Sequence, residues 1–249
     1  MSPQATFYFS EELTDFLLPG RRNEGFRCIF EQSPSVKHLV ESLGVPHTEV
    51  ARIVVNGAPV DFRYKVQDGD RIDVHSFSPE DIRASGNPGH DPLRPEARFV
   101  LDNHLGKLAA YLRILGFDAL YRNDYQDDEL VQVALDEDRI LLTRDRRLLM
   151  RRALTHGYCV RSLDPKLQVG EVVRRFGLLE HIRPFRRCLR CNHPLQPIPK
   201  EEIMHCLEPL TRAFYDDFHI CPSCDQVFWK GSHYERMLKL VENVSSSKE

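Results

Sequence analysis

Apolar and polar positions follow two different periods along this chain. In the first 80 residues, short segments such as 5–9 and 26–30 alternate with a period of two, which predicts strands with one buried face. Residues 36–43 instead carry apolar side chains at helical spacing, with Ser35 as a predicted N-cap and Gly44 as a predicted stop.

Further strands follow this helix. They are predicted at 53–55, 60–62 and 71–75. Asn56-Gly57 stands between the first two, and this dipeptide is typical of a tight hairpin turn. Two strands, a helix and then more strands is the element order of a β-grasp fold.

From residue 98 the pattern alternates between strands and helices. Strands are predicted at 99–101, 117–121, 139–143 and 158–161. Helices are predicted at 105–115, 127–135, 146–154 and 167–176. This alternation indicates an α/β fold with a parallel sheet, whose functional groups lie beyond the carboxyl ends of the strands.

Composition places the boundaries between these regions. Residues 81–97 are rich in proline and glycine and lack an apolar period, which predicts a linker. The expected organisation is a β-grasp domain at 1–80, the linker, an α/β domain at 98–187, a segment with two CxxC motifs at 188–240 and a disordered tail at 241–249.

The chain contains no apolar run near 18 residues and no secretory signal at its N-terminus, so we expect no membrane span and a cytoplasmic protein. Its seven cysteines are an odd number, and four of them form CxxC pairs. This usage favours metal binding in a reducing compartment over a disulfide framework.

The two CxxC motifs carry the most specific chemical signal. Cys188 and Cys191 form one pair and Cys221 and Cys224 the other, with 29 residues between them. Four thiolates fit a tetrahedral, structural zinc site, and the long insert must then form its own excursion. Alternative ligands are His193, His205, Cys206 and His219. Trp229, close to the second pair, either packs under this ribbon or stacks on nucleic-acid bases.

Three aspartates stand at the ends of predicted elements. Asp102 and Asp145 follow strands, and Asp127 opens a helix. Each one alone is as well explained as a helix N-cap. Together, on a parallel sheet, they predict carboxylates that converge on a hard cation such as Mg²⁺ or Mn²⁺. Such an ion lowers the pKa of an attacking water and stabilises charge on a phosphoryl group, which favours a metal-dependent nuclease.

The middle of the chain is also its most basic part. Residues 98–187 hold 17 Lys and Arg against 13 Asp and Glu. Basic groups around an acidic metal site suit a polyanionic substrate, although arginines also commonly solvate helix faces. Arg147 and Arg151 have the spacing of neighbours on one helix face. The candidate substrate-binding residues are Arg144, Arg146, Arg147, Arg151, Lys107 and Arg113, with Arg152 beside them.

Several of these motifs resemble those of one family. Residues 98–240 resemble the Mut7-C RNase domain in the motifs FVLD at 99–102, LGKLA at 105–109, LRILGFD at 112–118, LTRD at 142–145, RCLRCN at 187–192 and FWKGSH at 228–233. Residues 3–80 are similar to the ubiquitin-like β-grasp domain that precedes Mut7-C. The matching motifs there are GVPHTEV at 44–50, VNG at 55–57 and DGD at 68–70.

This resemblance implies a PIN-like nuclease fold, RNA as the substrate and a metal site of PIN type at Asp102, Asp127 and Asp145. A fourth acidic residue is expected from such domains, with Asp128 and Asp164 as candidates. The β-grasp unit is expected to dock a protein partner. A sulfur-carrier role is excluded because such carriers need a C-terminal Gly-Gly, and the chain has no Gly-Gly dipeptide.

Two other functions fit the same features. A non-catalytic RNA- or ribosome-binding protein would need only the basic patch, the ribbon and a docking module, and its acidic residues would be helix caps. A toxin-like nuclease held inactive by its own β-grasp domain is the third hypothesis. The RNA-binding hypothesis predicts salt-dependent RNA binding without turnover. The toxin-like hypothesis predicts higher nuclease activity after deletion of residues 1–90.

Overall fold

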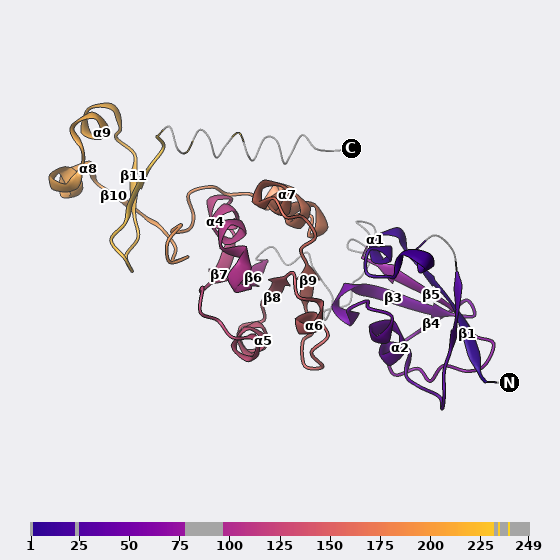
Figure 1. Ribbon diagram of the computed structural model, residues 1–249. Helices are drawn as coiled ribbons and strands as arrows, with labels where there is room; N and C mark the ends of the chain where they lie inside the picture. The colour runs from indigo at the N-terminus through magenta and orange to yellow at the C-terminus, as the bar shows by residue number, and fades with distance from the viewer. Residues whose placement is uncertain (1, 23–24, 78–96, 232–233, 235–238, 240–249) are drawn as a thin grey trace. The chain divides into compact units, whose positions relative to one another are not determined.

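The computed structural model describes residues 2–22, 25–77, 97–231, 234 and 239 (Figure 1). The predicted linker at 81–97, except Ala97, and the predicted tail at 241–249 lie outside these residues. The chain divides into two compact units: Met1–Asp91 with Gln126–Cys159, and Pro92–Tyr125 with Val160–Glu249. Within the described part, no helix has the length and apolar character needed to cross a membrane.

The N-terminal region is a five-stranded mixed sheet with the order β2-β1-β5-β3-β4. The central strands β1 and β5 run parallel, and the other pairs are antiparallel. The strands are β1 (Gln4–Phe9), β2 (Phe26–Ile29), β3 (Val50–Val55), β4 (Ala58–Val60) and β5 (Arg71–Ser76). This mixed sheet with one main helix confirms the predicted N-terminal fold.

The main helix of this region begins at the predicted residue and ends within one residue of the predicted end. Ser35 caps α2 (Val36–Ser42) by accepting a hydrogen bond from the backbone N–H of His38, and Gly44 follows with φ +100°. Asn56 and Gly57, both with positive φ, form the turn between β3 and β4. The shorter elements are α1 (Glu11–Thr14) and the 3-10 turns η1 (Pro19–Arg21) and η2 (His47–Glu49).

The following region contains a four-stranded sheet with the order β7-β6-β8-β9. Its strands are β6 (Arg98–Leu101), β7 (Asp118–Tyr121), β8 (Ile140–Thr143) and β9 (Gly157–Cys159). β6 pairs with β7 and β8 with β9 in parallel, and the apolar side chains of β6 are fully buried. Burial of a whole strand is typical of parallel sheets covered by helices, and this confirms the predicted α/β fold.

Helices connect these strands as the period change predicts. They are α4 (Gly106–Ile114), preceded by η3 (Asn103–Leu105), then α5 (Asp127–Asp136), α6 (Arg146–Leu149), α7 (Pro165–Arg175) and the 3-10 turn η4 (Leu179–His181). Gly116 follows α4 with φ +96°, and an added Cβ there would lie 2.0 Å from the carbonyl oxygen of Arg183. A larger residue would therefore be excluded at this turn by both backbone strain and contact.

Two details of the helix prediction are wrong. The N-cap of α5 is Gln126, whose N–H donates to Glu129 Oε2, so Asp127 is the first helical residue and not the cap. Helix α6 ends at Leu149, five residues earlier than predicted, because the chain turns to bury Leu154. Arg151 is therefore beyond the helix and does not share a helix face with Arg147.

The C-terminal region is a three-stranded antiparallel sheet with the order β10-β11-β12. Its strands are β10 (Gln196–Ile198), β11 (Phe218–Ile220) and β12 (Val227–Trp229). Between β10 and β11 the chain forms α8 (Lys200–Ile203), η5 (Met204–Cys206) and α9 (Pro209–Phe214). Ile203, Leu207 and Phe218 make a small core there, so the long insert forms the excursion that its length predicts.

Candidate functional site

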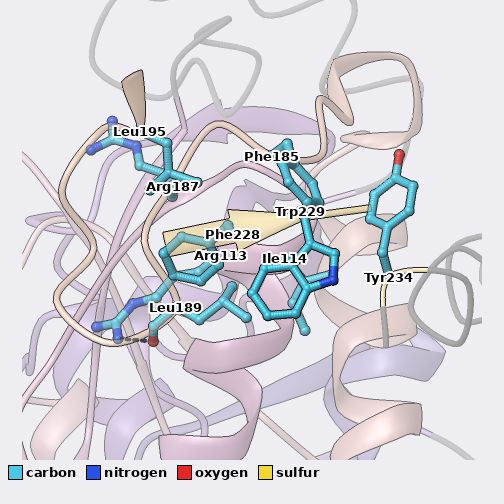
Figure 2. Close-up of a pocket in the computed structure, with 9 residues that line it drawn as sticks. All are labelled: Arg113, Ile114, Phe185, Arg187, Leu189, Leu195, Phe228, Trp229 and Tyr234. Carbon is cyan, nitrogen blue, oxygen red and sulfur yellow. Dashed lines mark hydrogen bonds between the residues drawn. The ribbon is translucent and has the colours of Figure 1, made fainter. Parts of the chain in front are cut away.

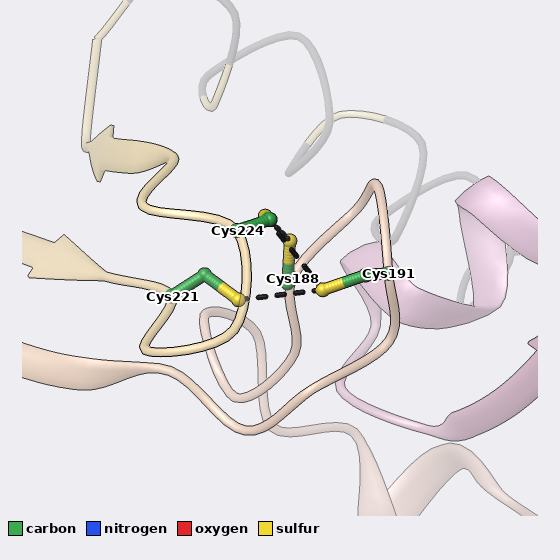
Figure 3. Close-up of side chains that lie close together, drawn as sticks. All are labelled: Cys188, Cys191, Cys221 and Cys224. Atoms are coloured by element: carbon green, nitrogen blue, oxygen red, sulfur yellow. Dashed lines mark hydrogen bonds between the residues drawn. The ribbon is translucent and has the colours of Figure 1, made fainter.

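Four cysteine side chains meet at the base of the C-terminal sheet (Figure 3). The sulfur atoms of Cys188, Cys191, Cys221 and Cys224 all lie within 4.8 Å of one another. The closest pairs are Cys191 with Cys221 at 3.3 Å and Cys188 with Cys224 at 3.6 Å. Tetrahedral zinc with Zn–S bonds of about 2.3 Å needs sulfurs about 3.8 Å apart, so this set can hold a zinc ion.

The two CxxC turns that supply these sulfurs have the same construction. The N–H of Asn192 donates to the carbonyl of Cys188, and the N–H of Asp225 donates to that of Cys221. Asn192 and Asp225 both have positive φ, at 67° and 57°. Asn and Asp tolerate this left-handed backbone better than most residues, so the residue after each CxxC fits the turn that brings its two sulfurs together.

The electrostatics of the cluster also fit a bound cation. Burial raises the pKa of Cys188 to about 12. For Cys191, burial is outweighed by hydrogen bonds from the His193 backbone and from neighbouring thiols, which lower its pKa to about 7. Packed sulfurs cannot all ionise next to one another without a positive charge between them. A zinc ion would supply that charge, and His193, His205, Cys206 and His219 are not part of the cluster.

Arg113 joins the first cysteine turn to the α/β region. Its Nη1 donates to the carbonyls of Leu189 and Arg190 at 2.9 and 3.1 Å, and its Nε donates to the carbonyl of Ala119. The side chain is 5% exposed, and burial lowers the pKa of the guanidinium. Arg113 was expected to bind substrate, but its guanidinium is buried and donates hydrogen bonds to these backbone carbonyls.

Asn192 makes a second connection between the same two regions. Its Oδ1 accepts from the N–H of Ala119 at 3.0 Å, and its Nδ2 donates to Asp118 Oδ1 at 2.7 Å. Asp118 also pairs with Arg187 at 3.2 Å. No role was predicted for Asn192 or Asp118, although both belong to the motifs that resemble the Mut7-C family and Asn192 directly follows a CxxC pair.

A pocket of about 60 Å³ lies beside these connections (Figure 2). Arg113 and Arg187 line it with their aliphatic stems while their guanidinium groups point away from the aromatic rings. Its other lining residues are Ile114, Phe185, Leu189, Leu195, Phe228, Trp229 and Tyr234. Trp229 also packs against the core of the C-terminal sheet. This packing fits the structural alternative for the tryptophan, and the pocket wall is mostly apolar.

The predicted acidic residues stand in contrasting surroundings. Asp102 follows β6 and is 8% exposed, whereas Asp127, Asp128 and Asp145 are exposed. Asp145 caps α6 through a 2.7 Å hydrogen bond from the N–H of Arg147, and its own N–H donates to Thr143 Oγ1. The cap role weighed for Asp145 is thus real, and it fixes the carboxylate just beyond β8.

The acidic residues are divided between the two compact units. Asp102 belongs to one, and Asp127, Asp128 and Asp145 belong to the other. Over the described residues, the four cysteines are the only set of three or more potential metal ligands gathered within 4.8 Å. The acidic metal site therefore stays a prediction. Asp164, the other candidate for a fourth acid, caps α7 by accepting from the N–H of Lys166.

The basic candidates also separate into different roles. Arg144, Arg147, Arg151 and Lys107 are exposed, and Arg151 forms a 3.0 Å ion pair with Asp128. Arg146 instead donates to the carbonyls of Asp15 and Phe16 in the β-grasp domain. Five of the six predicted substrate-binding residues are thus exposed, Arg146 among them, although Arg146 and the buried Arg113 are both bonded to backbone carbonyls.

Comparisons with known proteins address the identity of the chain. Searches of curated proteins and of solved structures gave no match. A family model described as the Mut7-C ubiquitin domain matches residues 2–80, and one described as the Mut7-C RNAse domain matches residues 97–241. Both confirm the resemblance predicted from the motifs. Since the second match spans more than half of the sequence, the chain belongs to the Mut7-C RNAse domain family, with a Mut7-C ubiquitin domain in front.

Proposed function

We propose that this protein is a metal-dependent ribonuclease that hydrolyses RNA phosphodiester bonds at an acidic site. One observation carries the proposal: in a chain with an RNAse domain, Asp102 and Asp145 each follow a strand of the parallel sheet. The order β7-β6-β8-β9 makes these two strands neighbours. Residues just past the carboxyl ends of such strands are where α/β folds bind ligands.

The proposed metal ligands are Asp102, Asp127 and Asp145, with Asp128 or Asp164 as a fourth acid. Carboxylates are the donors that Mg²⁺ and Mn²⁺ prefer, so the residue types fit these ions. When bound, the metal would activate water and offset charge on the phosphate. The protein holds Asp145 through its bonds to Arg147 and Thr143, so that carboxylate needs little reorganisation during the reaction.

RNA would be held by the exposed cations beside this site. Arg144 and Arg147 flank Asp145 in sequence, and Arg151 and Lys107 are also exposed. Guanidinium groups bind phosphate through paired hydrogen bonds, and their contribution to affinity falls as salt rises. We assign no RNA contact to Arg113 or Arg146, because their guanidinium groups are bonded to protein carbonyls.

The remaining parts of the chain would support this activity. We propose that zinc on the four cysteines holds the C-terminal sheet together and takes no part in the reaction, because four protein ligands would leave no open position. The proposed nuclease fold is PIN-like and the proposed location is the cytoplasm. The β-grasp domain would act as a docking module.

The decisive experiment compares wild type with Asp145→Asn on a mixed set of labelled RNAs with Mg²⁺ or Mn²⁺. Asparagine caps helices as well as aspartate does, so the variant should fold and bind RNA normally. It should lose at least about 100-fold in cleavage rate if the carboxylate helps to bind the metal. The matched control is Asp136→Asn, an exposed aspartate at the end of α5, which should cleave as wild type does.

A second function is favoured by the roles that the acidic residues already have. Asp145 and Asp164 cap helices, and Asp128 pairs with Arg151. In a non-catalytic RNA-binding protein, helix capping and ion pairing would be the only roles of these acidic residues. Cleavage that survives in both Asp102→Asn and Asp145→Asn would exclude the proposed acidic site. Absence of cleavage in wild type, with tight and salt-sensitive RNA binding, would favour the binding protein.

A further inference from the structure

The β-grasp domain bonds to the segment that follows Asp145. Arg146 is the first residue of α6, and its Nη1 and Nη2 donate to the carbonyls of Phe16 and Asp15, both at 3.2 Å. The guanidinium also lies over the Phe16 ring, 4.9 Å from its centroid. An added Cβ on Gly44 would lie 2.9 Å from that same Phe16 carbonyl oxygen. The backbone at Gly44 therefore packs closely against the loop whose carbonyls accept from Arg146.

Glu49 makes a second connection at the far end of the same segment. Its Oε1 accepts from the N–H of Cys159, the last residue of β9, at 2.6 Å. Glu49 is 2% exposed and Cys159 is 6% exposed. A carboxylate is rarely buried unless it is hydrogen-bonded. This buried bond therefore marks a built contact between the two regions and not a chance encounter of surface groups.

His47 makes the third connection, through both nitrogens of its ring. Its Nδ1 lies 2.7 Å from Glu41 Oε1, and its Nε2 lies 2.9 Å from the carbonyl oxygen of Leu154. The His47 side chain therefore joins α2 to the segment that contains Leu154. Glu41 lies on α2, and the Phe62 ring stands edge-on to the imidazole at an interplanar angle of 89°.

The segment between these connections has little structure of its own. Helix α6 is four residues long and β9 is three. An isolated helix of one turn is not stable in water. β9 also pairs with β8, so Cys159 is held by the sheet as well as by Glu49. At the other end of the segment, Arg146 belongs to a one-turn helix, and Asp145 is joined directly to it.

We propose that Asp15, Phe16, His47 and Glu49 form a docking surface on the β-grasp domain whose partner is the segment 146–159 of the same chain. Docking holds the N-terminus of α6 and thereby positions Asp145. Arg146 is then a positioning residue and not an RNA contact, and His47 binds the Leu154 end of the segment. The consequence for catalysis rests on the proposed ribonuclease function, whereas the docking itself does not.

Arg146→Lys separates the two roles of Arg146 in the full-length chain. Lysine keeps the charge that would bind phosphate, but it lacks the fork that reaches two carbonyls and the flat face that stacks on Phe16. We expect cleavage to show a fall of about tenfold in kcat with little change in KM, as for a misplaced catalytic group. Arg63→Lys, an exposed arginine of the β-grasp domain, is the control. An unchanged kcat, or a change confined to KM, would overturn the positioning role.

Amide hydrogen exchange tests the docking without any cleavage. In Arg146→Lys and in His47→Gln, peptides covering 146–159 should exchange severalfold faster than in wild type, whereas peptides from β6 and α4 should not change. His38→Gln, an exposed histidine on α2, is the control for His47.

The exchange result decides the docking, and the cleavage result decides the proposed enzyme. Unchanged exchange of 146–159 in both variants would overturn the docking surface even in an active ribonuclease. If exchange responds as expected but wild type cleaves no RNA, the docking surface stands and the proposed ribonuclease fails.

Discussion

The cysteine cluster and the acidic residues are both predicted metal sites, yet the chain builds them differently. All four cysteines belong to one compact unit, and each CxxC pair occupies a single short turn. Asp102 belongs to that unit, but Asp127 and Asp145 belong to the other. Local spacing is therefore enough to specify the first site, whereas the second depends on how separate parts of the sheet pack. A change in packing should affect the acidic site and spare the cysteines.

Removal of the metal from the cysteine cluster should have the largest effect. Structural zinc contributes about 10 kcal/mol or more to the folding of small zinc domains. The C-terminal core is small and contains Phe218 with Trp229 packed against it. A strong chelator should therefore unfold this region and shift the emission of Trp229, the only tryptophan in the chain. Added zinc should restore the signal.

Cysteine variants sharpen this zinc test. Cys221→Ser should lose stoichiometric zinc in a metal analysis and give the chelated spectrum without chelator. Cys206→Ser is the control, because Cys206 is exposed, lies outside the four-cysteine cluster and donates its thiol to the Ile203 carbonyl. Retention of one zinc per chain by Cys221→Ser would contradict the four-cysteine site.

Arg113→Met should have the next largest effect, on stability. Methionine keeps the apolar stem but leaves the carbonyls of Ala119, Leu189 and Arg190 without their donor, at a cost of about 2–4 kcal/mol. Thermal unfolding would show this loss. Lys107→Met on the same helix is exposed and should change stability by less than about 0.5 kcal/mol.

RNA affinity should fall more in Lys107→Met than in Arg113→Met, which is the reverse of their expected effects on stability. Lys107→Met should weaken salt-dependent RNA binding, whereas Arg113→Met should leave the affinity of the folded protein unchanged. A loss of RNA affinity in Arg113→Met, at a temperature where the variant is fully folded, would show that Arg113 contributes to RNA binding. It would contradict the distinction between cations bonded to backbone carbonyls and exposed cations.

The features that the sequence predicted depend on neighbouring residues. Ser35, Gly44, the Asn56-Gly57 turn and the CxxC pairs each act within a few positions, so their roles follow from residue type and spacing. The order of strands and helices along the chain also followed from apolar periodicity, because each element buries one face or both faces.

The features that the sequence did not predict join distant parts of the chain. His47 and Leu154 are 107 positions apart, and Arg113 and Leu189 are 76 apart. Nothing near Arg113 or Arg146 distinguishes an arginine that binds carbonyls from one that binds phosphate, so both were assigned to the substrate. The end of α6 was misplaced for the same reason, because burial of Leu154 is decided by tertiary packing and not by helix propensity.

The ion pair between Arg151 and Asp128 should have the smallest effect on stability. Its side chains are 48% and 86% exposed, and exposed pairs contribute about 0.2–1 kcal/mol at most. A double-mutant cycle with Arg151→Ala and Asp128→Asn should give a coupling energy at the low end of this range.

The same substitutions should have opposite effects on RNA binding. Arg151→Ala should weaken RNA binding. Asp128→Asn, which frees Arg151 and removes a negative charge, should strengthen it in the absence of divalent metal. A coupling energy above about 1 kcal/mol, with RNA affinity unchanged in both single variants, would make the pair structural and remove Arg151 from the proposed RNA surface.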